Sequence, residues 1–109
     1  MTKLLEITDW GLIEELRKNP EPLIVTVVDR LNGRHARAAR RMAELAAFYD
    51  EASFRLIDAA EHPSMRRVLS LRRLPGVVVF TGGRELRRWQ GRVEKRWVAS
   101  ALSAYLDRS

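Results

Sequence analysis

The chain has 109 residues, of which 46% are hydrophobic and 31% charged, and it contains no cysteine. A chain of this length is expected to form one domain, here residues 1–109, because a second core would leave both cores too small. The lack of cysteine excludes disulfides, thiolate nucleophiles and thiolate metal sites. No apolar run approaches the roughly 20 residues of a membrane span, and no basic segment followed by a long apolar stretch opens the chain. We therefore expect no membrane contact and a cytoplasmic location.

Positive charge is concentrated in the later part of the chain. The net charge is +6, and because residues 1–29 hold three basic and six acidic side chains, residues 30–109 carry +9. Seventeen of the 20 basic residues are arginine, whose planar guanidinium suits carboxylates and phosphates. This pattern favours an acidic partner, but a solubilising surface or a compositional bias toward arginine would produce it equally well.

The first half of the chain alternates between strand and helix patterns. Thr8 or Asp9 can cap a helix that ends before Pro20. The β-branched residues of the second strand, without strict alternation, are typical of a strand buried on both faces in mid-sheet. We predict strands at Leu4–Ile7, Leu23–Val28 and Ser53–Asp58, a helix around Leu12, Ile13 and Leu16, and a longer helix over Arg34–Tyr49.

The second half of the chain adds a short helix, a hairpin and a closing helix. The pair Gly82-Gly83 predicts a tight turn between two antiparallel strands, of which the second is arginine-rich and suits an exposed edge. The predicted elements are a helix from His62-Pro63 to Leu69, strands at Gly76–Phe80 and Arg84–Gln90, and a helix over about Val93–Leu106. Alternating strands and helices indicate an α/β protein with helices on both faces of the sheet.

This order of elements resembles the thioredoxin family over nearly the whole chain. The segment Asn32-Gly33-Arg34-His35 falls where the family has Cys-Gly-Pro-Cys, and Leu71–Pro75 followed by Val77–Phe80 resembles the segment around its cis-proline. Gly83 and Gly91 match two later glycines. The resemblance implies a thioredoxin-like fold with a central mixed sheet of four or five strands and three or four flanking helices. It also implies a cis bond before Pro75.

The departures from the family pattern all remove its redox chemistry. Both cysteines are replaced, Thr26 stands where the family usually has a buried aspartate, and Leu31 stands in place of the usual tryptophan. Disulfide exchange requires thiolate attack through a mixed disulfide, and neither asparagine nor histidine can form one. We therefore expect no oxidoreductase activity and no cofactor.

The resemblance also implies a groove, which in the thioredoxin family binds extended polypeptide. In this chain the corresponding residues are Asn32, Gly33, Arg34, His35, Arg73, Leu74, Pro75, Gly91 and Arg92. Arg34 and Arg37, near the positive end of a helix dipole, would attract an anion. The first hypothesis is therefore a non-redox adaptor or chaperone that holds an extended, acidic protein segment in the groove beside Pro75.

Two residues of this loop have more than one interpretation. Asn32 is expected to cap the long helix, its side-chain oxygen accepting a backbone hydrogen bond. His35, in an electropositive first turn, is expected to be neutral and able to accept a hydrogen bond from a partner. Catalysis by His35 is disfavoured because the loop supplies no nucleophile or second acid. Metal binding is disfavoured as well, since His62, the only other histidine, lies far away.

Binding of nucleic acid or another anion, driven by arginine, is the alternative function. It requires the basic side chains to form a continuous strip with exposed aromatic rings for stacking. Trp89, on the predicted edge strand, is the best aromatic candidate, whereas Trp10 and Trp97 are expected to pack against the sheet. The basic residues form two groups, Arg66, Arg67, Arg72 and Arg73, which are expected to frame the groove, and Arg84, Arg87, Arg88, Arg92, Lys95 and Arg96.

Overall fold

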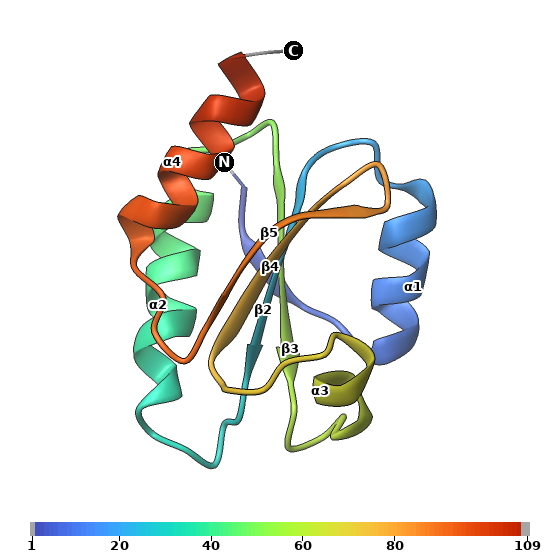
Figure 1. Ribbon diagram of the computed structural model, residues 1–109, viewed down its shortest axis with the longest axis vertical. Helices are drawn as coiled ribbons and strands as arrows, with labels where there is room; N and C mark the ends of the chain where they lie inside the picture. The colour runs from blue at the N-terminus through green and yellow to red at the C-terminus, as the bar shows by residue number, and fades with distance from the viewer. Residues whose placement is uncertain (1, 108–109) are drawn as a thin grey trace.

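The computed structural model describes residues 2–107. The elements follow in the predicted order (Figure 1), and within the described residues no helix has the length and hydropathy that a membrane crossing requires. They are β1 (Leu4–Glu6), α1 (Asp9–Lys18), β2 (Leu23–Val28), α2 (His35–Ala46), β3 (Ser53–Asp58), α3 (Ser64–Val68), β4 (Gly76–Thr81), β5 (Arg84–Gln90) and α4 (Lys95–Asp107).

The five strands form one mixed sheet in the order β1-β3-β2-β4-β5. The pairs β1–β3 and β3–β2 are parallel, whereas β4 runs antiparallel to both β2 and β5. The predicted central strand is confirmed, because every residue of β2 is buried and the strand has a partner on each side. The predicted edge is confirmed too, since β5 has one partner and most of its side chains are exposed.

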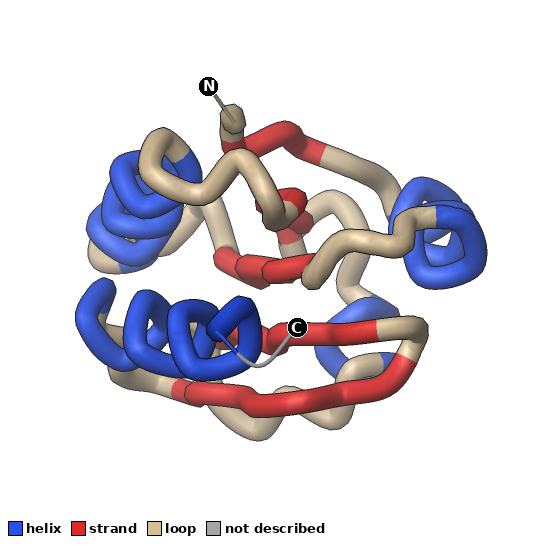
Figure 2. Tube along the Cα trace, turned by 90° about the horizontal axis from the view of Figure 1, so that it is seen from above, coloured by secondary structure: helices blue, strands red, loops and turns tan. Residues whose placement is uncertain are grey.

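Two hydrophobic cores lie on opposite faces of the sheet. Helices α2 and α4 cover one face and α1 and α3 cover the other, which Figures 1 and 2 show from two directions. Alternate residues of β2 supply the two cores: Ile24 faces Met42 of α2 and Leu102 of α4, while Val25 and Val27 face the cluster that contains Leu12 and Met65. This two-sided burial explains why β2 is continuously apolar apart from Thr26.

One expectation about the core is wrong. Trp10 does not pack against the sheet, because its side chain is 73% exposed on the outer side of α1. The first turn of α1 is instead anchored by Thr8, whose hydroxyl oxygen accepts the hydrogen bond of the Gly11 amide at 3.1 Å. Leu12, two residues after Trp10, carries the buried contact of the helix. The helical period therefore turns Trp10 outward.

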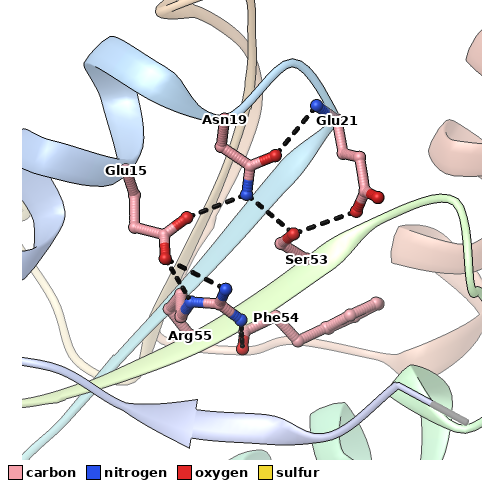
Figure 3. Close-up of polar contacts among 6 residues, drawn as sticks. All are labelled: Glu15, Asn19, Glu21, Ser53, Phe54 and Arg55. Atoms are coloured by element: carbon pink, nitrogen blue, oxygen red, sulfur yellow. Dashed lines mark hydrogen bonds and ion pairs between the residues drawn. The ribbon is translucent and has the colours of Figure 1, made fainter.

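A polar network joins the end of α1 to the start of β3 (Figure 3). The Asn19 amide nitrogen donates to Glu15 Oε2 and to Ser53 Oγ, each at 2.8 Å, and Ser53 donates to Glu21 Oε2 at 3.0 Å. Arg55 Nε donates to Glu15 Oε1 at 3.0 Å. Because Arg55 and Glu15 are only 14% and 23% exposed, water screens this ion pair weakly. The network fixes α1 against the parallel half of the sheet.

Replacement of Arg55 by alanine is expected to lower the free energy of unfolding by about 2 kcal/mol, because Glu15 would lose a largely buried partner. Chemical denaturation measures the change. Arg17→Ala is the matched control, since Arg17 is 71% exposed and its contact with Glu14 is 3.9 Å long, and it should change stability by less than about 1 kcal/mol. Equal effects of the two substitutions would contradict a structural role for the network.

Candidate binding groove beside Pro75

The pairing of β2 with β4 brings two distant loops together. Val27, near the end of β2, is the register partner of Gly76, the first residue of β4. Because the two strands are antiparallel, the loop that leaves β2 and the loop that enters β4 emerge at the same edge of the sheet. Residues 29–34 therefore lie beside residues 71–75.

The loop before β4 carries the predicted cis bond, between Leu74 and Pro75. The backbone after β5 holds this loop: the Gly91 amide donates to the Pro75 carbonyl at 2.9 Å, and the Arg72 amide donates to Gln90 Oε1 at 2.6 Å. Gly91 has φ +81°, and a Cβ there would lie 3.1 Å from Cδ of Arg73. The left-handed conformation favours glycine at position 91, and an added Cβ would also force the Arg73 side chain to move.

One arginine from each of the two basic groups donates hydrogen bonds to backbone carbonyls of the same loop. Arg66 donates through Nε to the Leu71 carbonyl at 3.1 Å and also to the Arg72 carbonyl. Arg88 donates to the carbonyls of Leu69 and Ser70, each at 2.9 Å, and pairs with Glu85. These guanidinium groups satisfy carbonyls that the irregular loop leaves without backbone partners.

The loop after β2 differs from the sequence prediction at its helical end. Asn32 is not the N-cap of α2, because the helix begins at His35 and Arg34 occupies the cap position without a side-chain hydrogen bond. Asn32 Oδ1 instead accepts the Arg34 amide at 3.0 Å, which closes a turn two residues long. A short asparagine-centred turn competes with helix capping for the same side chain, and sequence alone does not separate them.

His35 is buried at 7% exposure, and its hydrogen bonding is also different from the expectation. Nδ1 accepts the backbone amide of Asp29 at 2.9 Å. The neutral ring therefore carries its proton on Nε2, so His35 has a donor rather than a free acceptor to offer a partner. The histidine closes the 29–35 loop and fixes the position of the first turn of α2.

Gly33 has no structural reason to be glycine. Its φ is not in the left-handed region, and a Cβ built at this position meets no atom within 4 Å. The residue thus leaves a stretch of bare, exposed backbone beside the start of α2, which a ligand can approach closely.

Seven of the nine predicted site residues line one hollow of about 320 Å³. They come from both loops and from the turn after β5: Asn32, Arg34, His35, Leu74, Pro75, Gly91 and Arg92. We call this hollow the Pro75 groove. Arg73 lies beside it against Gly91, and Gly33 lines the hollows on the other sides of the loop.

The groove is also lined by Arg37, which the sequence analysis expected to attract an anion, and by three residues that it did not name as site residues, Ala38, Arg41 and Val93. The three helical residues follow Arg34 at spacings of three, four and seven positions, which place them on one face of α2. This periodicity could have identified them. Val93 could not have been found in this way, because it reaches the groove only through the packing of α4 against the sheet.

Positive charge dominates the Pro75 groove. Glu94 pairs with Arg92 at 3.0 Å and lies 3.9 Å from Arg41. The hydrogen bond from Arg92, together with the charges of Arg41 and Arg96, lowers the pKa of Glu94, so this carboxylate stays ionised at neutral pH. Arg34 and Arg37 have no acidic partner among residues 2–107. Two guanidinium groups therefore remain for an anionic ligand.

The basic group near α3 does not frame the groove as a whole. Arg66, Arg67 and Arg72 line a separate hollow with Pro63, Ser70 and Leu71, and Arg73 alone reaches the Pro75 groove through its contact with Gly91. The arginines of the chain thus form separate groups rather than one strip around the groove.

Thr26 occupies the position that the resemblance assigns to a buried acid. It is fully buried, and it is the one residue among those described whose buried side-chain polar atom, Oγ1, has no hydrogen-bond partner. Its neighbour Ile24 on the same side of β2 packs beneath α2 and α4. The hydroxyl therefore incurs a desolvation cost with no interaction to offset it.

Replacement of Thr26 by valine should raise the free energy of unfolding by about 1 kcal/mol, because it removes an unsatisfied hydroxyl and keeps the shape of the side chain. Thermal and chemical unfolding measure the change. Thr8→Val provides the contrast, since the Thr8 hydroxyl caps α1, and this substitution should lower stability by about 1 kcal/mol. If Thr26→Val destabilises the protein as Thr8→Val does, the Thr26 hydroxyl has a hydrogen-bond partner in solution.

The Glu85–Arg88 pair predicts a pH dependence of stability. The hydrogen bond from Arg88 lowers the pKa of Glu85 from its ordinary value of 4.5. Since the folded-state pKa is the lower one, the pair stabilises the protein above pH 4.5 and loses this contribution as the pH falls through the folded-state pKa. Glu85→Gln should therefore destabilise the protein at pH 7, by less than about 1 kcal/mol for a partly exposed pair, and the difference should shrink at acidic pH.

Chemical denaturation of the wild type and of Glu85→Gln, from acidic pH to pH 7, measures this difference in stability. Glu14→Gln serves as the control, because Glu14 is 51% exposed and does not contact the loop beside Pro75. If the free energies of unfolding of the wild type and Glu85→Gln differ by the same amount at neutral and acidic pH, the stabilising role of the Glu85–Arg88 pair is contradicted.

Comparison with solved structures identifies the fold. Thioredoxin z of chloroplasts matches with a TM-score of 0.85 and 21% identity, over 98% of this chain and 97% of that one. A single-residue variant of thioredoxin from Halobacterium salinarum matches with a TM-score of 0.82 and 16% identity, over 95% and 90% of the two chains. No family model and no curated protein sequence matches. Over residues 2–107 the protein has a thioredoxin-like fold, with one five-stranded mixed sheet and four helices, and its sequence contains no cysteine.

Proposed function

We propose that this protein is a non-redox binding module, an adaptor or chaperone, that holds an extended acidic segment of another protein in the Pro75 groove. The proposal includes a cytoplasmic location and no enzymatic activity. A chain without cysteine cannot carry out disulfide exchange, so the groove would act by binding alone.

The observation that carries the proposal is that two arginines without acidic partners and the cis-proline loop line one hollow. Arg34 and Arg37 lie on the α2 side of the groove, and Leu74 and Pro75 lie on the opposite side. Half-buried apolar atoms beside guanidinium groups suit a segment that alternates apolar and acidic side chains. The two sides come from different loops, so an extended segment would lie between them.

The loops of the groove are held in place before any partner arrives. His35 fixes the α2 side through the Asp29 amide, and Gly91 fixes the other side through the Pro75 carbonyl, each at 2.9 Å. A preformed site loses little conformational entropy on binding. Rigid walls thus favour recognition of a segment that is itself unstructured, which matches the task of an adaptor or a chaperone.

Catalysis by His35 lacks support in the site. Its Nδ1 already accepts the Asp29 amide, which leaves Nε2 as a donor in the neutral ring. The remaining groove residues, including Asn32, Arg34 and Arg37, offer neither a nucleophile nor a general base. Nε2 of His35 and the guanidinium groups would instead donate hydrogen bonds to carboxylates or carbonyls of the partner.

Selection of peptides from a random displayed library by the purified protein tests the proposal. The selected peptides should be enriched in aspartate and glutamate. In ¹⁵N-labelled protein, a selected peptide should shift the amide resonances of residues 32–35, 73–74 and 91–92. Arg34→Glu combined with Arg37→Glu should weaken its binding by at least roughly ten-fold through charge repulsion.

Two further variants make this experiment specific. Arg67→Glu makes the same kind of charge change outside the groove and should leave binding nearly unchanged. Gly33→Ala should keep or slightly raise stability, because nothing lies within 4 Å of the added Cβ, but should weaken peptide binding where the partner approaches this backbone. Resonance shifts confined to another surface, or equal losses for Arg67→Glu and the groove variants, would overturn the proposal.

A further inference from the structure

A second hollow, of about 500 Å³, lies between the edge strand β5 and helix α4. Arg87 and Trp89 alternate onto one face of β5, and Trp97, Ser100, Ala101 and Ala104 follow at helical spacing along the facing side of α4. The small residues of α4 leave space beside the two indole rings. Figure 2 shows α4 lying alongside this end of the sheet. We call this hollow the tryptophan hollow.

Both tryptophans remain partly exposed, and each ring is stacked with a guanidinium group. Cζ of Arg87 lies 5.4 Å from the centroid of Trp89, and Cζ of Arg92 lies 5.7 Å from the centroid of Trp97. Trp97 was expected to pack against the sheet; it is partly buried and lines the hollow beside Arg87 and Trp89 of β5. Indole rings and guanidinium planes are the flat surfaces on which unpaired nucleobases stack.

The rim of the tryptophan hollow carries unpaired positive charge. Glu85 is held by Arg88, and Glu94 by Arg92. Arg84, Arg87 and Arg96 form no salt bridge among residues 2–107, although the charge of Arg96 acts on Glu94. Arg87 lines the hollow from β5, Arg84 lies three residues before it on the same strand, and Arg96 lies one helical turn before Ser100, so both elements carry cationic groups near the hollow.

We propose that the tryptophan hollow binds single-stranded nucleic acid, with bases stacked on the Trp89–Trp97 surface and phosphates paired with Arg84, Arg87 and Arg96. This function is separate from the peptide binding proposed for the Pro75 groove. The hollow is open along the sheet edge, which suits a continuing strand better than an isolated nucleotide. A duplex fits less well, because its bases are already stacked on each other. An acidic peptide also fits less well, because aspartate and glutamate have no ring to stack on the two indoles.

Fluorescence anisotropy with a labelled oligothymidylate of about twelve nucleotides, within the usual site size of single-strand binding folds, tests the proposal. The protein should bind the strand at low salt and bind a duplex of equal length more weakly. Trp97→Leu should weaken binding roughly ten-fold, the loss expected for one stacked base. Arg87→Gln should reduce the slope of log affinity against log salt by about 0.7, the value for one phosphate on a single strand.

Matched variants distinguish this site from general attraction to a basic protein. Trp10→Leu and Arg67→Gln, on the opposite face of the molecule, should leave binding nearly unchanged, as should Gly33→Ala in the loop beside the Pro75 groove. Ser100→Glu places a carboxylate in the hollow at an exposed helical position and should weaken binding even where Trp97→Leu impairs folding. No binding at low salt, equal affinity for duplex and single strand, or equal losses from Trp10→Leu and Trp97→Leu would overturn the proposal.

Discussion

The antiparallel pairing of β2 with β4 is the constraint on which the candidate site depends. Because β2 is buried in mid-sheet and pairs through Val27 with Gly76, the loops at residues 29–34 and 71–75 must leave the sheet at one edge. In the thioredoxin-like fold this juxtaposition does not require cysteine. The sulfur chemistry is absent, yet the sheet still brings a helix start, a cis-proline and a glycine turn to one place.

The loops at this edge are held by side chains that replace regular backbone pairing. His35 accepts the Asp29 amide, while Arg66 and Arg88 satisfy carbonyls of residues 69–72. Part of the arginine content is therefore structural, and a count of arginines overestimates the charge that remains for partners. Among residues 2–107, guanidinium groups without acidic partners lie in separate groups around the start of α2, along β5, and at α3 and the loop after it. This separation is the reason to assign two different ligand chemistries to two surfaces.

Several features of the site were predictable from local sequence because local rules govern them. The arginine at position 37 follows position 34 by three residues, which puts both on one helical face. Gly91 was matched only through the resemblance to the thioredoxin family, and its left-handed φ of +81° is seen only in the structure. Features that depend on which of several hydrogen-bond partners a side chain takes were not predictable. Asn32 closes a turn instead of capping α2, and the acceptor nitrogen of His35 is used inside the protein. In both cases the path of the loop backbone over residues 29–35 decides which of two similar hydrogen bonds forms.

The sequence by itself determined the order of the elements, the central position of β2 and the loss of thiol chemistry, since periodicity, β-branching and the absence of cysteine are properties of the chain alone. Only the tertiary structure decided which side chains remain available to partners. Trp10 and Trp97 were both expected to pack against the sheet, yet Trp10 points outward from α1, and Trp97 is only partly buried beside Trp89. The sequence shows that an aromatic side chain is hydrophobic, but its exposure depends on which element packs against it. Beside Trp97, the small residues of α4 leave the hollow open.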